Sequence, residues 1–304
     1  MSPVDVGERI AGGLLGVAAG DALGVTLEFS PAHARRAEPH QDITGGGPFG
    51  FGAGEGSDDS DLTWATIQAI IDAGDQPGRT IRFAADRMAA WLDTKPRDVG
   101  ATTAAALRAY RAGGRLDASA AVAGEWGAGN GSLMRALPTG LVRTSLPARA
   151  AEARALSAIT HADPRCTHSC VAYCELAAAL VTGRPALDTI RALAADDTLR
   201  RDVRGALNLG TMATPGVLRP TGYVLDTLTV ATWAVCHSAS LEETLVAVVN
   251  LGGDADTTGA VAGGLLGVRD GVAAIPARWA DRLDYTARFT EAARALEVLR
   301  QPRS

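Results

Sequence analysis

The sequence predicts an all-α fold that forms a single domain over residues 1–304. Apolar side chains recur at helical spacing through most of the chain, as Ile10, Leu14 and Leu15 do near its start. Sustained alternation of apolar and polar residues, the pattern of strands, is almost absent. No internal repeat, low-complexity tract or interdomain linker interrupts the pattern. The periodicity predicts helices over 6–27, 62–74, 80–93, 101–112, 147–160, 165–182, 186–195, 222–237, 240–249, 257–268 and 284–300, with a less regular stretch from 196 to 220.

Glycine is concentrated in two segments of the N-terminal half. The first predicted helix contains Gly12, Gly16, Gly20 and Gly24 although glycine disfavours helices, which indicates that another backbone packs closely against it. The second segment, 39–56, is rich in glycine interleaved with phenylalanine. We expect this loop to form a lid or a wall of a functional site.

Composition and charge exclude several classes of protein. With 47% hydrophobic and 21% charged residues, the chain has the composition of a soluble globular protein. Its formal net charge of -5 argues against stable binding to nucleic acid. The longest uncharged gap, 227–241, is shorter than the roughly 20 residues of a membrane span. Because Asp5 and Glu8 precede the early apolar run, a signal peptide is not expected, and we predict a cytoplasmic protein without a membrane partner.

Three of the four cysteines lie four residues apart, at 166, 170 and 174. With His161 and His168 nearby, a zinc site is one interpretation. Thiolate zinc sites usually use two-residue spacings, however, whereas this spacing places the three thiols on one side of a helix. We therefore expect small buried side chains in a reducing compartment.

The most informative segment is 250–267, which contains Asp254, Asp256 and Thr257 ahead of an uncharged, small-residue helix. One aspartate at this position is an ordinary helix cap. Two carboxylates this close repel each other, and oxygen-binding cations such as Mg²⁺ or Ca²⁺ relieve that repulsion.

A second acidic segment repeats this arrangement. Ser57, Asp58 and Asp59 follow a glycine-rich approach and precede another helical pattern. A solvated turn with a helix cap is the simpler interpretation. If the two segments meet in space, their four aspartates provide the charge that two divalent ions require, and paired metals are an established catalytic arrangement.

Other candidate residues have weaker signals when each is taken alone. Glu28 is either part of a capped helix end or a carboxylate in a pocket, and Asp98 is either a helix cap or an acid/base group. Asn130 and Ser132 stand in a glycine-rich segment at a predicted helix start, where backbone N–H groups bind anions. His161 follows a predicted helix and is either a structural histidine or a ligand contact.

Six blocks of sequence, taken together and in order, resemble the ADP-ribosylglycohydrolase family. The resemblance runs through nearly the whole chain, and the paired-aspartate block near its end is the most specific. The blocks are Gly20-Asp-Ala-Leu-Gly24 with Glu28, Ser57-Asp-Asp59, Lys95-Pro-Arg-Asp-Val-Gly100, Gly129-Asn-Gly-Ser-Leu-Met-Arg135, Thr160-His161 and Gly252-Gly-Asp-Ala-Asp-Thr257.

The resemblance implies a compact orthogonal helical bundle with a central dinuclear metal site for Mg²⁺ or Mn²⁺. It implies metal ligands on two sides, with Asp256 as a bridging group between the ions. It also implies that a Gly-Asn-Gly-Ser segment and a histidine line the diphosphate and distal ribose of ADP-ribose. Carried over, the metal ligands are Ser57, Asp58, Asp59, Asp254, Asp256 and Thr257, and the substrate-binding residues are Asn130, Gly131, Ser132 and His161.

Two departures from the family pattern bear on the chemistry. Ser57 replaces the usual threonine but keeps the hydroxyl. Ala101 follows the Asp-Val-Gly block where the family usually has asparagine. Arginine-type members use an acidic residue at the position of Asp98, and serine-type members use a glutamate at that of Glu28. Both carboxylates are therefore candidates for the catalytic acid/base.

The implied activity is metal-dependent hydrolysis of the C1″ glycosidic bond, which releases ADP-ribose from a protein, nucleic acid or small-molecule conjugate. Two alternatives differ from it. A catalytically silent ADP-ribose binder or a structural, crystallin-like member of the fold would bind or pack without turnover. A metallophosphatase or nuclease would use the same ions, but its ligand pattern differs and the chain has only 5 histidines.

Overall fold

The computed structural model describes residues 5–33, 37–116, 127–237 and 240–301. Within these ranges the chain is helical and contains no strand, only isolated bridges between Gly46 and Phe51 and between Gly129 and Tyr223. The predicted all-α class is confirmed, whereas the single-domain organisation stays a prediction. The α-helices are α1 Val6–Gly24, α2 Asp58–Ala73, α3 Pro77–Asp93, α4 Ala101–Gly113, α6 Leu137–Val142, α7 Leu146–Ala158, α8 Pro164–Val181, α9 Ala186–Ala195, α10 Arg201–Met212, α11 Val224–His237, α12 Leu241–Val249, α13 Ala255–Asp270, α14 Ala277–Ala280 and α15 Thr286–Arg300, and the 3-10 turns are η1 Pro215–Val217 and η2 Val272–Ala274.

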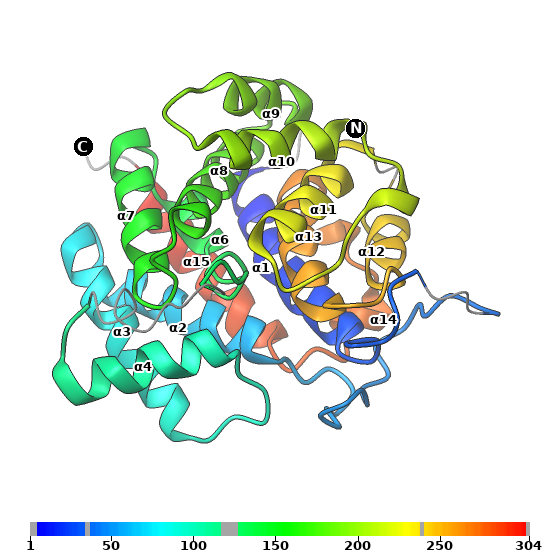
Figure 1. Ribbon diagram of the computed structural model, residues 1–304, viewed down its shortest axis with the longest axis horizontal. Coiled ribbons are helices and arrows are strands. Elements are labelled where there is room, and N and C mark those ends of the chain that lie inside the picture. Colours follow the sequence, from blue (N-terminus) through cyan, green and yellow to red (C-terminus); the bar gives the residue numbers. More distant parts are fainter. Residues whose placement is uncertain (1–4, 34–36, 117–126, 238–239, 302–304) are drawn as a thin grey trace.

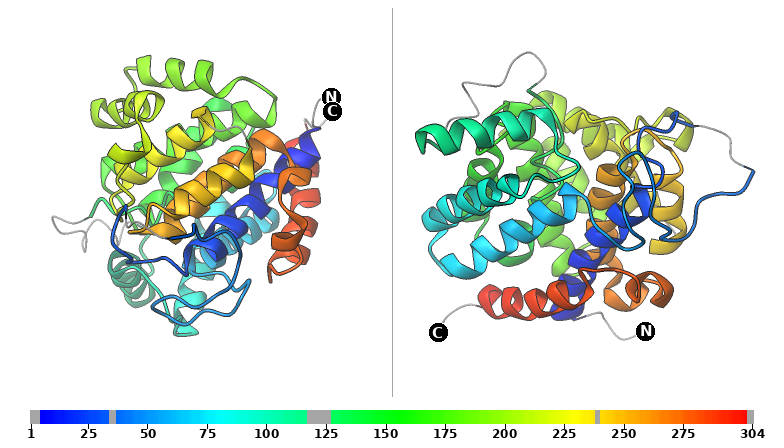
Figure 2. Two further views of the ribbon diagram at one scale, coloured as in Figure 1. Left: turned by 90° about the vertical axis from the view of Figure 1, so that its right-hand side faces the viewer. Right: turned by 90° about the horizontal axis from the view of Figure 1, so that it is seen from below.

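Helices α1 and α13 form a central antiparallel pair, side by side in Figures 1 and 2. Their glycines meet in register, so the predicted close backbone packing is confirmed. A Cβ atom added at Gly16 would lie 2.1 Å from the carbonyl oxygen of Gly263, and one added at Gly20 would lie 2.0 Å from that of Gly259. This contact brings the C-terminal end of α1 to the N-terminal end of α13, where the paired aspartates begin the helix.

Helix α2 begins at Asp58, four residues before the predicted start at Leu62. Ser57 caps the helix with its side-chain oxygen, which accepts a hydrogen bond from the backbone N–H of Asp59. The predicted boundary was wrong because four polar residues at the start interrupt the apolar periodicity. They belong to the first turn, where carboxylates suit the positive end of the helix dipole.

Three further expectations need correction. The first helix ends at Gly24 rather than at Leu27, and a regular helix, α10, occupies 201–212 in the stretch expected to be irregular. Asn130 and Ser132 do not stand at a helix start: 131–135 form consecutive turns, and α6 begins only at Leu137. Gly205 and Gly210 weaken the helical signal of α10, and its packing against α11 and α9 overrides that weakness.

Helix α8 crosses the interior, and its three cysteines are buried free thiols, as expected from their spacing. Within the described chain no cysteine belongs to a cluster suited to a metal ion. The hydroxyl of Tyr173, in the same helix, donates to the carbonyl oxygen of Val261 at 2.9 Å and so ties α8 to α13.

No helix in the described residues is long and apolar enough to cross a membrane.

Candidate functional site

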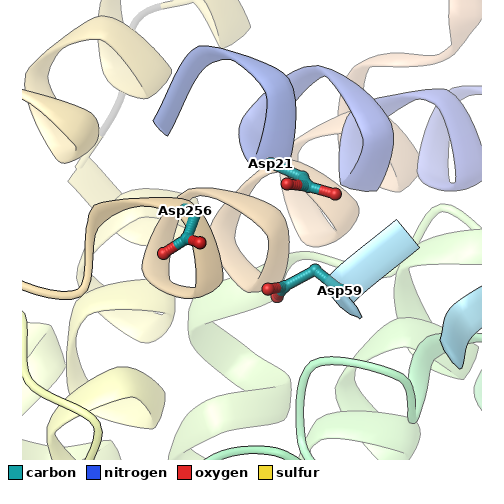
Figure 3. A group of neighbouring side chains, drawn as sticks. All are labelled: Asp21, Asp59 and Asp256. Atoms are coloured by element: carbon teal, nitrogen blue, oxygen red, sulfur yellow. The ribbon is translucent and has the colours of Figure 1, made fainter. Parts of the chain in front are cut away.

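A cavity of about 540 Å³ lies where α1, α2 and α13 converge. Figure 3 shows Asp21 from α1, Asp59 from α2 and Asp256 from α13 around a common space. The cavity brings together nine of the twelve residues predicted for the site. They are Glu28, Asp58, Asp98, Asn130, Gly131, His161, Asp254, Asp256 and Thr257.

The two acidic segments meet directly. Thr257 Oγ1 donates to Asp59 Oδ2 at 3.2 Å, although the two residues are 198 positions apart. Ser57 Oγ donates to the same carboxylate oxygen at 3.2 Å. Ser57 and Asp59 do not contribute to the cavity wall itself and lie immediately behind it, buried. Hydroxyl groups from both segments therefore converge on one carboxylate.

Asp21 fixes the start of α2 against the end of α1. Its carboxylate is fully buried and accepts hydrogen bonds from the backbone N–H groups of Ser57, at 3.0 Å, and Ser60, at 3.1 Å. The hydroxyl of Ser60 donates to it as well. Because these bonds are charge-assisted, they hold the first turn of α2 more firmly than a neutral cap would.

The carboxylates form two overlapping groups that can hold cations. In one, oxygens of Asp21, Asp59 and Asp256 lie within 4.8 Å of one another, and in the other the same holds for Glu28, Asp98 and Asp256. Asp256 belongs to both. The donor set is entirely oxygen, which Mg²⁺ and Mn²⁺ prefer.

Buried oxygens without partners provide an independent test of the fit to cations. Asp59 Oδ1, Asp256 Oδ1 and Glu28 Oε2 are buried and accept no hydrogen bond. Such atoms are costly unless a ligand satisfies them, and a divalent ion satisfies several at once. The chemistry of the residues present therefore fits a divalent metal site.

Burial and mutual repulsion raise the pKa values of these acids. The pKa values of Asp59 and Asp256 are raised well above the ordinary range, first by burial and then by neighbouring carboxylates. Burial raises the pKa of Glu28 to about 8, with the Asp98 charge as the next cause. Burial likewise raises the pKa values of Asp21 and Asp98 to about 6. A cluster this unfavourable to negative charge attracts cations.

The segment before α13 places Asp254 at the cavity through a tight loop. Gly253 has a φ of +64°, and a Cβ there would lie 2.0 Å from the carbonyl oxygen of Pro220, so only glycine fits. Asp254 accepts a hydrogen bond of 2.7 Å from the side-chain amide of Asn130. The predicted substrate segment and the predicted metal segment are thereby joined.

The remaining predicted residues differ in how they face the cavity. Gly131 and His161 line it, whereas Ser132 is buried beside it and its Oγ accepts from Ser157 Oγ at 2.9 Å.

Asp98 lies in the loop before α4. Its neighbour Arg97 is bound to the glycine-rich loop through the carbonyl oxygen of Gly50, at 2.9 Å.

The glycine-rich loop forms a wall of a second, smaller hollow of about 220 Å³. Phe51 and Glu55 from the loop line it, together with Asp58 and Asp98, which also line the main cavity. The loop does not line the main cavity, and its residues reach only the neighbouring hollow behind these two carboxylates. Its role as a lid or wall of the functional site stays a prediction.

The sequence did not predict Asp21, Arg135 or Thr160 as site residues, although each lies within one of the six blocks that resemble the family. Their one shared signal is a single polar side chain in a buried segment. All three side chains are at most 2% exposed. Because buried polar groups need partners, an isolated polar residue in an apolar segment indicates a contact with a distant part of the chain.

Comparison with known proteins places this arrangement in a family. The sequence profile of ADP-ribosylglycohydrolase matches residues 2–304. The chain belongs to the ADP-ribosylglycohydrolase family. A solved structure titled ADP-ribosylglycohydrolase-related protein complex superposes with a TM-score of 0.84 at 30% identity, over 98% of this chain and 99% of that one. The family membership and the all-α family fold are therefore confirmed.

Two curated members of the ADP-ribosylglycohydrolase family show what the relatives do. The ADP-ribosylarginine hydrolase Tri1 of Pseudomonas putida (strain GB-1) is 32% identical over 97% of this chain and 80% of its own length. The ADP-ribosyl-[dinitrogen reductase] glycohydrolase of Rhodospirillum rubrum is 32% identical over 93% of both chains. The names of these relatives describe hydrolysis of ADP-ribosylated targets.

Proposed function

We propose that the protein is a divalent-cation-dependent hydrolase that cleaves the C1″ N- or O-glycosidic bond of an ADP-ribosylated target and releases ADP-ribose. The observation that carries the proposal is the position of Asp256, whose carboxylate belongs to both acidic groups, one at the cavity wall and one immediately behind it. A carboxylate shared in this way suits a bridge between two Mg²⁺ or Mn²⁺ ions. Ser57, Asp58, Asp59, Asp254 and Thr257 would complete the ligand set. Asp21 lies beside it in the first acidic group, and the acid/base candidates Glu28 and Asp98 lie beside it in the second.

Different residues of the site would carry out different steps of the reaction. Divalent ions, when bound, supply positive charge that orients sugar hydroxyls and lowers the pKa of water. Cleavage builds positive charge on the ribose, which nearby carboxylates stabilise. Glu28 and Asp98, which line the cavity, would give a proton to the leaving group and take one from water. Asn130, Gly131 and His161 hold the rest of ADP-ribose in the cavity.

A panel of ADP-ribosyl conjugates tests the proposal. Purified protein is incubated with conjugates linked through arginine, serine, a nucleobase and a small ester, with Mg²⁺, with Mn²⁺ or with EDTA, and free ADP-ribose is measured. We expect release from at least one conjugate that EDTA abolishes and added ions restore. Tight ADP-ribose binding without release from any conjugate would instead support a silent binder.

Two conservative variants test the acid/base assignment. Glu28→Gln and Asp98→Asn each keep the size of the side chain and remove its ability to carry the proton. We expect at least one of them to lose 10²-fold or more in kcat, the usual order of magnitude for general acid–base catalysis, while ADP-ribose still binds. Full turnover in both variants would exclude these carboxylates from proton transfer.

A further inference from the structure

A chain of buried hydrogen bonds runs from Arg135 through Thr160 to His161, beneath the wall of the cavity. Arg135 Nη2 donates to Thr160 Oγ1 at 2.7 Å, and Thr160 Oγ1 lies 2.8 Å from His161 Nδ1. Thr160 is fully buried and His161 is 2% exposed. The chain ends at the imidazole, which lines the cavity.

The direction of each bond follows from what each group can donate. A guanidinium has only donors, so the Thr160 oxygen must accept from Arg135. The hydroxyl of Thr160 keeps one proton, and His161 Nδ1 is the only acceptor that the described residues offer it. If Nδ1 carried a proton instead, the Thr160 hydroxyl proton would be buried without a partner, at a cost of about 1–3 kcal/mol. Nδ1 is therefore the acceptor.

From this chain we infer that Arg135 and Thr160 are positioning residues that hold His161 as a neutral imidazole protonated at Nε2, so that it presents a hydrogen-bond donor to an oxygen of the ligand. Nε2 makes no hydrogen bond to any residue that the structure describes, and the ring faces the backbone of Gly129 and Gly131. A Cβ atom at Gly129 would lie 3.3 Å from Nε2, so these glycines keep the approach to the nitrogen open.

Arg135 also brings a buried positive charge to this wall. It is 2% exposed, forms no salt bridge with the described residues, and its Nε has no acceptor. The charge of Asp58 acts on it only at a longer range than a salt bridge. A buried charge without a directly paired counter-charge is costly, so its presence points to a role beyond packing. It also donates to the carbonyl oxygen of Gly131 and so fixes the turn that lines the cavity.

Burial, with the Arg135 charge as the second cause, lowers the pKa of His161 to about 3. Both effects agree with the donor geometry, since each favours the neutral ring. The inference rests on the proposed function only for the identity of the ligand, whose diphosphate and ribose oxygens accept hydrogen bonds. The tautomer itself is a property of the free protein.

Nuclear magnetic resonance of ¹⁵N-histidine-labelled protein tests the tautomer without any substrate. The His161 signals are assigned by their loss in His161→Gln. We expect a protonated Nε2 and an unprotonated Nδ1 that persist from pH 8 down to pH 5. A ring protonated at Nδ1, or one that becomes charged within this range, would overturn the inference even if the protein is an active hydrolase.

Variants at Thr160 test its role as the link in the chain. Thr160→Val removes the hydroxyl at constant shape, and Thr160→Ser is the matched control that keeps it. We expect the valine variant to lose the fixed tautomer and to bind ADP-ribose about 3- to 10-fold more weakly, the effect of one hydrogen bond, with the serine variant close to wild type. An unchanged tautomer in the valine variant would overturn the positioning role. If that variant does not fold, the wild-type spectrum decides alone.

Discussion

Thr257 Oγ1 donates a hydrogen bond of 3.2 Å to Asp59 Oδ2, which joins the two acidic segments of the chain. Helix α13 supplies the donor and helix α2 the acceptor. The bond exists because glycines bring α1 and α13 into backbone contact, and because Asp21 of α1 holds the first turn of α2. The site is therefore a product of the helix packing, and its properties can be tested through that packing.

Asp256→Asn is expected to abolish ADP-ribose release while the protein stays folded. The substitution removes the one charge common to both acidic groups and keeps the size of the side chain. Circular dichroism and ADP-ribose release measure the two effects. Asp281→Asn, at an exposed position, is the matched control and should behave as wild type. Full activity of Asp256→Asn would remove the basis of the proposed mechanism.

Asp21→Asn is expected to weaken divalent-ion affinity by about 10-fold or more. The Asp21 carboxylate accepts hydrogen bonds from two backbone N–H groups and one hydroxyl, and a neutral amide replaces it poorly as an acceptor. Hydrogen bonds to a charged group contribute about 1.5–3 kcal/mol each. Titration calorimetry measures the affinity. Ser60→Ala removes only one of these donors and should have a smaller effect. An equal effect of the two variants would mean that the charge of Asp21 does not matter.

Gly16→Ala is expected to destabilise the fold by about 1–3 kcal/mol through overpacking. Its new Cβ would lie 2.1 Å from the carbonyl oxygen of Gly263, so α1 and α13 must move apart. Gly205→Ala in α10 is the matched control, since nothing lies within 4 Å of its added Cβ. That change should stabilise by up to about 1 kcal/mol through helix propensity. Urea unfolding of both variants checks the difference, and equal stability would contradict the close packing.

Without divalent ions, the stability of the protein is expected to fall as the pH rises from 4.5 to about 8. The pKa of Glu28 is raised from 4.5 to about 8, so the folded state retains a proton that the unfolded state has lost. The associated stability is present below pH 4.5 and is lost as the pH rises through 8. Thermal unfolding in EDTA should show this slope, and saturating Mg²⁺ should reduce it. Identical profiles with and without the ion would contradict a cation site among these acids.

The sequence predicted the fold class and most of the site because both have local signals. The helical periodicity marks most helices, and the spacing of Asp254, Asp256 and Thr257 marks the start of α13. The roles of Asp21 and Arg135 were not predicted, since a single polar residue in an apolar segment also fits an ordinary cap. Their functions appear only when α2 and Thr160 are brought beside them, which depends on packing between distant segments.

The start of α2 shows the same limit at the level of secondary structure. Periodicity placed it at Leu62, because only apolar residues contribute to the signal. The true start at Asp58 depends on the Ser57 cap and on the carboxylate of Asp21, from a helix that ends 34 residues earlier in the sequence than α2 begins. Local pattern therefore located the helix, and tertiary hydrogen bonds determined where it begins.

Isothermal titration of the metal-free protein with Mn²⁺ tests the central claim most directly. We expect two ions to bind per chain in the wild type, and neither to bind with comparable affinity in Asp256→Asn. Absence of divalent binding to the wild-type protein, or unchanged binding to the Asp256→Asn variant, would contradict a dinuclear site that is organised around this carboxylate.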